Sequence, residues 1–437
     1  MKPYTRITGL ALSVAGMVLA GASFGSLEAE EPAGKPGAGV QLGPKQTIER
    51  KVKLMTGPSV YLDDEGSLAA VWVEEEQERR TVFYARSLTA NGPLGAPVHV
   101  NRQDEAPYWR QEAPALAVRG NDVYVTWALT HPNATPAQPF SSQLRLSRSE
   151  DGGRTFLPSI LVNDDAAVAN HSFDSLHVAD DGVVHMAWID PREGAKDPAT
   201  FIAKSLDRGR SVGKNLKIDG DTCVCCRTAV TTAPDGALYV AWRKIFSGDV
   251  RETVVARSTD GGAIFSNPVI VGHDRWAFPG CPHRPASLGV DGQGRLYVSW
   301  YTEGDDETPA VYLAFSDDHG QTFSPKQMLN VSRGTFPDHP QMAVDRDGRI
   351  IAVWEEQSPV RREIVMRVSL DRGRTFGPPQ KLNEKKGQGP TVAVNRRGTA
   401  ALAWLEHAMP GHRLVVQTLR LPQVVASDMR TVSEAMR

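Results

Sequence analysis

The sequence has no excess of charge of either sign. Its 49 Lys and Arg residues are balanced by 51 Asp and Glu residues, which leaves a net charge of -2. This balance provides no attraction to nucleic-acid phosphates or to an anionic membrane surface, so we expect neither partner. Apolar runs of spanning length are absent after the N-terminal region, so we also expect no membrane span in the mature protein.

Cysteine is scarce, with 4 residues in a chain of 437. The core must therefore come from the hydrophobic fraction of 41% and the aromatic fraction of 7%, which can supply one. The few cysteines are nevertheless concentrated in two short segments near the middle of the chain: Cys223, Cys225, Cys226 and Cys281.

The N-terminus has the pattern of a signal peptide. Lys2 and Arg6 form a positive region, Leu10–Leu19 an apolar one, and Ala20-Gly21-Ala22 a small-residue cleavage site. We predict export to the periplasm or the medium with cleavage after Ala22, with Ala29 as the alternative site. The composition of residues 23–46 predicts a flexible lead-in, and residues 426–437 a loose tail.

A tryptophan-bearing apolar segment of strand length recurs along the chain at intervals of 50 to 61 residues. A turn containing glycine precedes each copy. The seven copies are marked by Trp72, Trp127, Trp188, Trp242, Trp300, Trp354 and Trp404. Such a period makes residues 47–425 one repetitive domain.

A second element, Ser-x-Asp-x-Gly, follows the third strand of most repeats. Its aspartates are Asp151, Asp207, Asp260, Asp318 and Asp371, and Ser87–Gly92 is a degenerate copy of the element. A short carboxylate can accept hydrogen bonds from the backbone of its own turn, and glycine supplies the unusual backbone angle. We therefore predict a structural role for these aspartates.

The element resembles the Asp box of the sialidase superfamily. The resemblance covers nearly all of the chain after about residue 50 and implies an all-β propeller with the boxes away from any catalytic centre. Seven repeats predict seven four-stranded blades, although six is the alternative because true sialidases have six. The segment Thr47–Leu54 is expected to complete the last blade.

With four antiparallel strands in each repeat, the connecting loops lie on two opposite faces of the propeller. Short turns and Asp boxes share one face, whereas long and varied loops share the other, where function is expected. Aligning the innermost strands places one residue of each at the channel rim: Thr56, Glu112, Ser172, Cys226, Arg284, Asp338 and Gln388. The same alignment brings His171, Cys225 and His283 to similar heights on adjacent walls.

The resemblance to sialidases implies an arginine cluster that binds a carboxylate, because a guanidinium matches a carboxylate bidentately. Arg227 and Arg284 fit this role, whereas the Arg-Ile-Pro segment and the Tyr–Glu pair of sialidases are not identifiable. The candidate catalytic carboxylates are Glu112, Asp174 and Asp338. The candidates for stacking on a ligand are Trp109 and Trp276, which lie outside the repeat.

The cysteines allow three interpretations. In an exported protein a disulfide is the default, here from Cys281 to the group of Cys223, Cys225 and Cys226. Thiolates with His283 and His171 would alternatively suit copper(I) or zinc, although Cys-x-Cys-Cys is not a standard zinc spacing. A catalytic thiol with one of the histidines as its base is the third.

Three functions follow from these patterns. The first is an exported binding or accessory protein that holds a glycan or another small anionic ligand at the channel mouth, with an envelope protein as a further candidate partner. The second is a sialidase-like glycoside hydrolase or a lyase acting on an anionic glycan. The third is a copper- or zinc-handling or redox protein that uses the Cys and His loops.

Overall fold

The structure, a computed structural model, describes residues 39–422 apart from 78, 103, 106, 108–112, 195–197 and 332–333. The predicted signal peptide and the candidates Trp109 and Glu112 lie outside the described residues. Every regular element within them is a β-strand, so the predicted all-β class is confirmed. No helix of the described part is long and apolar enough to cross a membrane.

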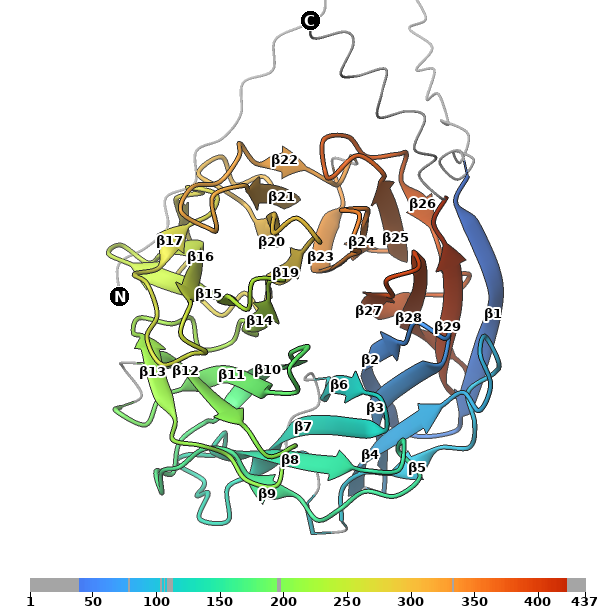
Figure 1. Ribbon diagram of the computed structural model, residues 1–437, viewed down its shortest axis with the longest axis horizontal. Helices are drawn as coiled ribbons and strands as arrows, with labels where there is room; N and C mark the ends of the chain where they lie inside the picture. The colour runs from blue at the N-terminus through green and yellow to red at the C-terminus, as the bar shows by residue number, and fades with distance from the viewer. Residues whose placement is uncertain are drawn as a thin grey trace, which may run out of the picture. The chain divides into compact units, whose positions relative to one another are not determined.

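Seven sheets of antiparallel strands are arranged around a central axis (Figure 1). Seven blades, and not six, form the ring, and we number them in chain order from β2. Blade 1 contains β2 (Leu54–Leu62), β3 (Leu68–Glu76), β4 (Arg79–Arg86) and β5 (Val98–His99). Blade 2 contains β6 (Ala115–Arg119), β7 (Asp122–Thr130), β8 (Ser142–Ser149) and β9 (Ile160–Leu161). Blade 3 contains β10 (Ser172–Val178), β11 (Val184–Asp190), β12 (Ala199–Ser205) and β13 (Leu216–Asp219).

The later blades follow the same order. Blade 4 contains β14 (Ala229–Thr232), β15 (Leu238–Phe246), β16 (Val250–Ser258) and β17 (Val269–Ile270), with the additional β18 (Trp276–Ala277) paired to β16. Blade 5 contains β19 (Ser287–Val290), β20 (Leu296–Thr302), β21 (Ala310–Ser316) and β22 (Gln327–Met328). Blade 6 contains β23 (Phe336–Val344), β24 (Ile350–Gln357), β25 (Arg362–Ser369) and β26 (Gln380–Lys381). Blade 7 contains β27 (Gly387–Val394), β28 (Thr399–Ala408), β29 (Gly411–Arg420) and β1 (Gln41–Arg50).

The first strand of the chain closes the ring by pairing with the last. β1 runs antiparallel to β29, from Gln41 opposite Arg420 to Arg50 opposite His412. The sequence predicts this closure, but the closing strand begins before Thr47 and ends before Leu54, which opens β2. The two ends of the domain therefore hold each other in one sheet.

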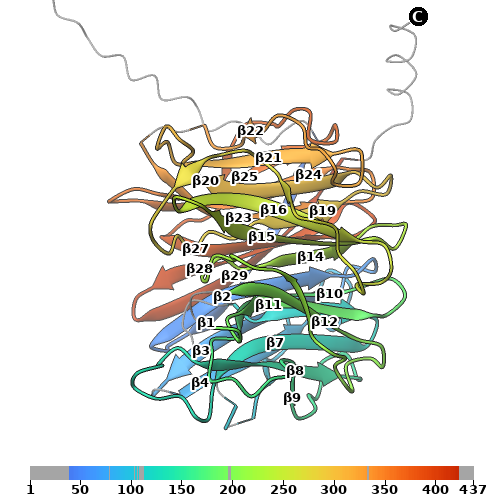
Figure 2. The same ribbon diagram turned by 90° about the vertical axis from the view of Figure 1, so that its left-hand side faces the viewer.

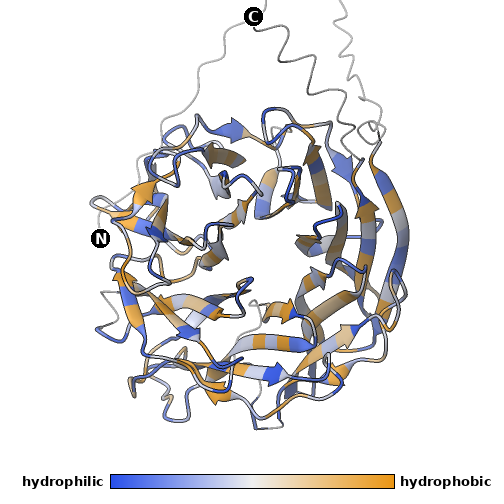
Figure 3. Ribbon diagram, in the orientation of Figure 1, coloured by the Kyte–Doolittle hydropathy of each residue, from blue (hydrophilic) through white to orange (hydrophobic). Residues whose placement is uncertain are grey.

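The core lies between the blades, which explains why the tryptophan-bearing segment of each repeat is buried. The second strand of each blade packs on both sides against neighbouring blades, so it is apolar on both faces. All seven repeat tryptophans lie in these strands and are at most 3% exposed. Figure 3 shows apolar residues on strands throughout the ring and polar residues in many of the loops.

The strands run from one face of the ring to the other (Figure 2). The Asp boxes follow the third strands and close as hydrogen-bonded turns. In the first, Ser149 Oγ donates to Asp151 Oδ1 at 2.7 Å, and the Thr155 amide donates to the same oxygen at 3.0 Å. Asp207, Asp260, Asp318 and Asp371 form equivalent bonds. Because the blades are antiparallel, the loops entering the first strands lie on the opposite face.

We expect the boxes to make the protein sensitive to acid. Hydrogen bonds from Thr322 lower the pKa of Asp318 to about 2, and similar bonds lower the pKa of Asp151. An unfolded Asp titrates near pH 3.9, so the unfolded chain binds more protons than the folded one below that pH. The stabilisation is therefore complete above about pH 4 and is lost as the pH falls towards about 2.

Urea denaturation at pH 5 and pH 3 checks this expectation. The free energy of unfolding should fall between the two pH values, and the fall should be smaller in Asp318→Asn. Asp305→Asn, which changes an exposed carboxylate outside the boxes, is the matched control. An identical fall in the wild type and in Asp318→Asn would contradict this role for the box.

Candidate functional site

The candidate site lies in the two loops that enter the adjacent blades 4 and 5. Residues 220–228 connect β13 to β14, and residues 278–286 connect β18 to β19. β14 and β19 are innermost strands and lie next to each other beside the central opening (Figure 1). All four cysteines, Arg227, His283 and Arg284 lie in these loops.

The first loop is fixed by backbone hydrogen bonds to the end of β15. The Cys223 amide donates to the Arg243 carbonyl at 2.8 Å, and the Ile245 amide donates to the Asp221 carbonyl at 2.7 Å. Thr222 forms a bridge with Lys244, so the loop continues the sheet by a short segment. This pairing directs the cysteine side chains into the protein.

Three cysteine thiols form a compact buried cluster, which we call the thiol triad: Cys223, Cys225 and Cys226. Each residue is at most 4% exposed. Cys223 Sγ lies 3.8 Å from Cys225 Sγ and 3.5 Å from Cys226 Sγ, and all three sulfurs lie within 4.8 Å of one another. Phe173 and Ile245 pack against the triad.

Two arginines of blade 4 lie beside the triad. Arg251 Nη1 donates to Cys223 Sγ at 3.0 Å, and its Nε donates to the Phe278 carbonyl at 2.6 Å. Arg243 is 3% exposed and donates Nη2 to the Tyr301 carbonyl, whereas its Nη1 has no partner among the described residues. The contacts of Cys223 with the other two thiols and the Arg251 charge lower the pKa of the Cys223 thiol.

The predicted disulfide between Cys281 and the other loop is not present. All four cysteines are free, and the three sulfurs of the triad are much farther apart than the roughly 2.05 Å of a disulfide. Cys281 is exposed, whereas the triad is buried behind its own loop. The triad instead contacts Arg251, whose Nη1 donates to Cys223 Sγ.

His283 of the second loop contacts Phe173, which packs against the triad. Its ring lies 5.8 Å, centroid to centroid, from the ring of Phe173, which belongs to the innermost strand of blade 3. Burial lowers the pKa of His283, while the nearby Cys223 opposes this shift. His283 has a φ of 52°, a backbone conformation that is costly for a residue with a side chain.

Arg227 spans the inner wall from blade 4 to blade 2. Its Nη2 donates to the Ala113 carbonyl, and its charge lowers the pKa of Asp174, although burial, the stronger effect, raises it. Thr126 Oγ1 donates to one oxygen of Asp174, and the other oxygen has no partner among the described residues. Asp174 is 1% exposed and therefore lies inside the wall.

Arg284 is paired on one side only. Its Nη1 lies 2.9 Å from Asp338 Oδ2, and its guanidinium lies 4.9 Å from the centre of the Tyr301 ring. Its Nε has no partner among the described residues, and its side chain is 24% exposed. Asp338 is buried.

Glu355 and His339 lie beside Asp338. His339 Nδ1 lies 3.0 Å from Asp338 Oδ1 and 3.4 Å from Glu355 Oε1. Although burial opposes it, the close contact with Asp338 and the charges of both carboxylates raise the pKa of His339. This corner therefore combines the Arg284 cation and His339, whose pKa is raised, with two carboxylates.

Two predicted residues belong to the packed interior instead. Trp276 is 2% exposed because the pairing of β18 with β16 turns it inward, against Phe278, Tyr301 and the Arg243 guanidinium. It therefore provides no open face for stacking on a ligand.

His171 is fully buried and does not reach the cysteines. Its Nδ1 lies 2.7 Å from the Ser142 carbonyl, and its Nε2 lies 3.1 Å from Asp165 Oδ2 and 3.4 Å from Asp190 Oδ1. Arg192 already pairs with both carboxylates, at 3.0 and 2.7 Å. Asp165 and Asp190 therefore already have a cationic partner in Arg192, and His171 does not join the thiol triad as a metal ligand.

Sequence reasoning missed Arg243, Arg251, His339 and Glu355. Arg243 follows directly after the repeat tryptophan, and Arg251 is the second residue of the next strand, so both interrupt segments that otherwise follow the repeat. A basic residue that is buried in a propeller strand is a signal, because burying its charge is costly without a partner. The partner could not be identified from sequence, since it lies in a different loop.

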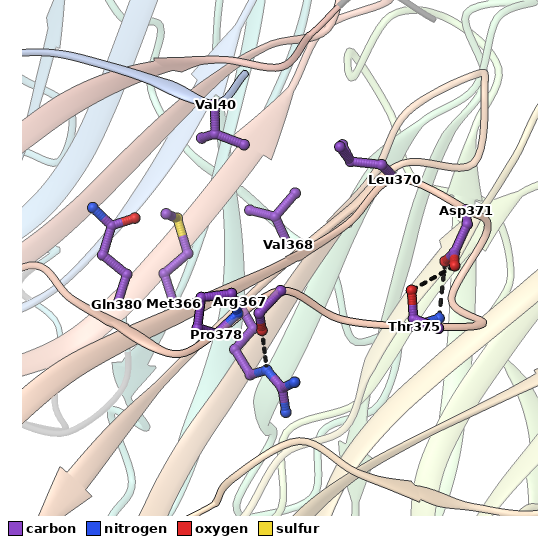
Figure 4. A pocket seen from close by; sticks show the side chains of 10 residues that line it. Val40, Met366, Arg367, Val368, Leu370, Asp371, Thr375, Pro378 and Gln380 are labelled. Carbon is purple, nitrogen blue, oxygen red and sulfur yellow. Dashed lines mark hydrogen bonds between the residues drawn. The ribbon is translucent and has the colours of Figure 1, made fainter. Parts of the chain in front are cut away.

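A separate cavity of about 280 Å³ lies at the other end of blade 6 (Figure 4). Its lining includes Val40, Met366, Val368 and Leu370, together with the box residues Asp371 and Thr375, which bond to each other. These side chains are apolar or already paired. We therefore assign the cavity to packing beside the closing strand.

No protein-family model and no curated protein sequence matches the chain. Solved structures do match it: the polysaccharide lyase Uly1 has a TM-score of 0.55 at 12% identity, over 84% of this chain and 90% of the lyase. A sialidase of Trypanosoma rangeli in complex with sialic acid has a TM-score of 0.50 at 12% identity, over 77% of this chain and 59% of the sialidase. The chain has a sialidase-like β-propeller fold.

A protein of unknown function from Dyadobacter fermentans DSM 18053 is similar over its whole length. Its TM-score is 0.51 at 15% identity, and the match covers 88% of this chain and 100% of that protein. At these identities the propeller is shared, and the chemistry must be argued from this chain's own residues.

Proposed function

We propose that this propeller binds an anionic glycan at the mouth of its central channel, between blades 4, 5 and 6. The observation that carries the proposal is Arg284. Its side chain is 24% exposed, lies over Tyr301 and pairs with Asp338 through Nη1, while its buried Nε has no partner among the described residues. A planar guanidinium oriented in this way matches a carboxylate or sulfate group of a sugar.

Neighbouring residues support binding at this position. Among the described residues Arg227 donates a hydrogen bond to the Ala113 carbonyl, and His339 is biased towards its cationic form by two carboxylates. The propeller fold is shared with a sialidase in complex with sialic acid and with a polysaccharide lyase. We therefore favour a carboxylated or sulfated sugar over a neutral one.

We favour binding over hydrolysis because the two candidate carboxylates among the described residues, Asp174 and Asp338, are engaged. Asp174 is enclosed with Thr126, and Asp338 is paired with Arg284 and contacted by Gln357 at 3.2 Å. A general acid or base must reach the proton that it transfers. Neither side chain is open to a substrate in this arrangement.

Titration calorimetry with a uronate-containing oligosaccharide and its carboxyl-reduced neutral form tests the proposal. The anionic form should bind more tightly, and Arg284→Met should weaken it by about tenfold or more, since a hydrogen bond to a charged group contributes about 1.5–3 kcal/mol. Arg275→Met, an exposed arginine that pairs with Asp305, is the control and should bind as the wild type does. Equal binding of both sugars would refute the proposal.

We also propose that the protein acts after export. The support is the charged, apolar and small-residue pattern that ends at Ala22. N-terminal sequencing of the protein recovered from its natural host tests this proposal. A mature chain that begins at Ser23, or at Glu30 if the alternative site is used, would support export, whereas a chain that retains Met1 would refute export by this route.

A further inference from the structure

We propose that Cys223, Cys225 and Cys226 form a three-coordinate site for a monovalent soft metal ion, copper(I), beside the channel mouth. The site is independent of glycan binding, because it uses residues behind the rim. Soft thiolates select copper(I) and zinc over hard cations. Spacing, charge and the position of the fourth cysteine then decide among the alternatives.

The spacing of the sulfurs suits a bound ion. A metal–sulfur bond of about 2.3 Å places the sulfurs of a trigonal or tetrahedral site roughly 3.8–4.0 Å apart. Two of the three separations in the triad, 3.5 and 3.8 Å, are close to this value. Three thiols from four consecutive residues are thus already gathered around one point, and little movement is needed to bind an ion.

The charges around the triad suit a monovalent ion. Three thiolates with one monovalent ion carry two negative charges, and two guanidiniums, those of Arg243 and Arg251, lie beside the triad. The complex with copper(I) is therefore neutral as a whole, whereas zinc would leave one uncompensated positive charge. An uncompensated charge in a buried site is costly, so the arginines favour the monovalent ion.

The site lacks the fourth ligand that zinc needs. Zinc in structural sites takes four ligands in a tetrahedron. The cluster of ligand atoms that lie within 4.8 Å of one another contains only the three cysteines among the described residues. Cys281 is exposed and His171 is bonded elsewhere, so the described site offers three ligands.

The unpartnered donor of Arg243 supports the same conclusion. Arg243 is 3% exposed, its Nη1 has no partner among the described residues, and its charge acts on Cys223 and Cys226. A buried guanidinium donor without an acceptor is costly. When the three thiols bind copper(I), their protons pass to the solvent, and the thiolate sulfurs become negatively charged acceptors.

The experiment is an anaerobic competition for copper(I) between the reduced, purified protein and the chromophoric chelator bicinchoninate. We expect one ion per chain, and X-ray absorption should show three sulfur neighbours. Cys225→Ser should weaken binding by more than about 100-fold, which exceeds the usual loss on changing an outer-shell partner. Cys281→Ser is the matched control and should bind as tightly as the wild type.

A second pair of variants tests the role of charge separately from the ligands. Arg251→Met should weaken copper(I) binding by about 10–100-fold, as expected for an outer-shell partner. Arg257→Met, on the same strand but at the end near the boxes, should have no effect. Circular dichroism of each variant shows whether it is folded. The copper(I) competition with the wild-type protein still tests the proposal if a variant does not fold.

Three results would overturn the proposal: no copper(I) bound by the reduced wild type, equal binding by Cys225→Ser and the wild type, or stoichiometric zinc in place of copper(I). Glycan binding by the same Cys225→Ser protein is measured in parallel. If Cys225→Ser loses copper(I) binding but still binds the glycan, the two sites are separate. Failure of the copper(I) proposal can then be distinguished from failure of the glycan proposal.

Discussion

A chain that lacks residues 1–50 is expected to lose cooperative folding. This deletion removes β1, which supplies the outer strand of blade 7 and pairs with β29 along nearly its whole length. It also removes Val40, Leu42 and Ile48 from the apolar clusters around Trp404 and Leu414. Several backbone hydrogen bonds at about 0.5–1.5 kcal/mol each approach the roughly 5–15 kcal/mol that stabilises a typical domain.

Guanidinium denaturation followed by tryptophan fluorescence measures this effect. A chain that lacks only residues 1–38 is the control, because it keeps all of β1. A synthetic peptide with the sequence of residues 39–50 should restore part of the transition when it is added to the shorter chain. If the chain without residues 1–50 unfolds at the wild-type denaturant concentration, the closing strand does not stabilise the ring.

Trp354→Ala is expected to lower the free energy of unfolding by about 3–5 kcal/mol. Trp354 is 1% exposed and belongs to the core between blades 5 and 6. Its indole Nε1 donates to Glu356 Oε1 at 2.7 Å, so the substitution also removes a hydrogen bond from a buried carboxylate. The cavity left by the indole and the unpaired Glu356 oxygen therefore both lower the free energy of unfolding.

Trp242 offers a matched comparison within the same repeat. It is equally buried, but its indole nitrogen has no partner among the described residues. Trp354→Phe should therefore destabilise the protein more than Trp242→Phe, by about the 1–3 kcal/mol of an unsatisfied buried group. Equal losses in urea denaturation would show that the Glu356 bond contributes nothing.

The repeat pattern predicted the ring because packing imposes it. Each second strand is enclosed by two neighbouring blades, so its tryptophan must recur once per blade, as Trp188 and Trp300 do. The Asp boxes are equally predictable, because Asp151 and its turn make only local hydrogen bonds. Local and periodic constraints can be read from one sequence.

For the candidate site, the sequence predicted the location but not the contacts between its side chains. The concentration of cysteines in two long loops identified blades 4 and 5, but not the direction of the side chains. Whether Cys281 meets Cys223 depends on how one loop pairs with β15 and the other with β16, which is a contact between distant segments. The inward turn of Trp276 follows from the same pairing and could not be anticipated.

The positions of the arginines follow the same rule. Arg251 and Cys223 are far apart in sequence, and their contact at 3.0 Å exists because β16 and the loop before β14 both pair with β15 in one blade. A charge in a strand signals a buried partner but does not identify it. The thiol triad and its arginines therefore emerge from the structure, whereas the boxes and the tryptophans emerge from the sequence.

Hydrogen–deuterium exchange with and without a saturating uronate-containing oligosaccharide tests the central claim, that ligand binds at the channel mouth between blades 4, 5 and 6. We predict slower exchange in peptides that contain the 220–228 and 278–286 loops and the start of β23. We predict unchanged exchange in the Asp-box peptides that contain Asp260 and Asp371. Protection confined to the box face, with unchanged exchange around Arg227 and Arg284, would contradict the claim.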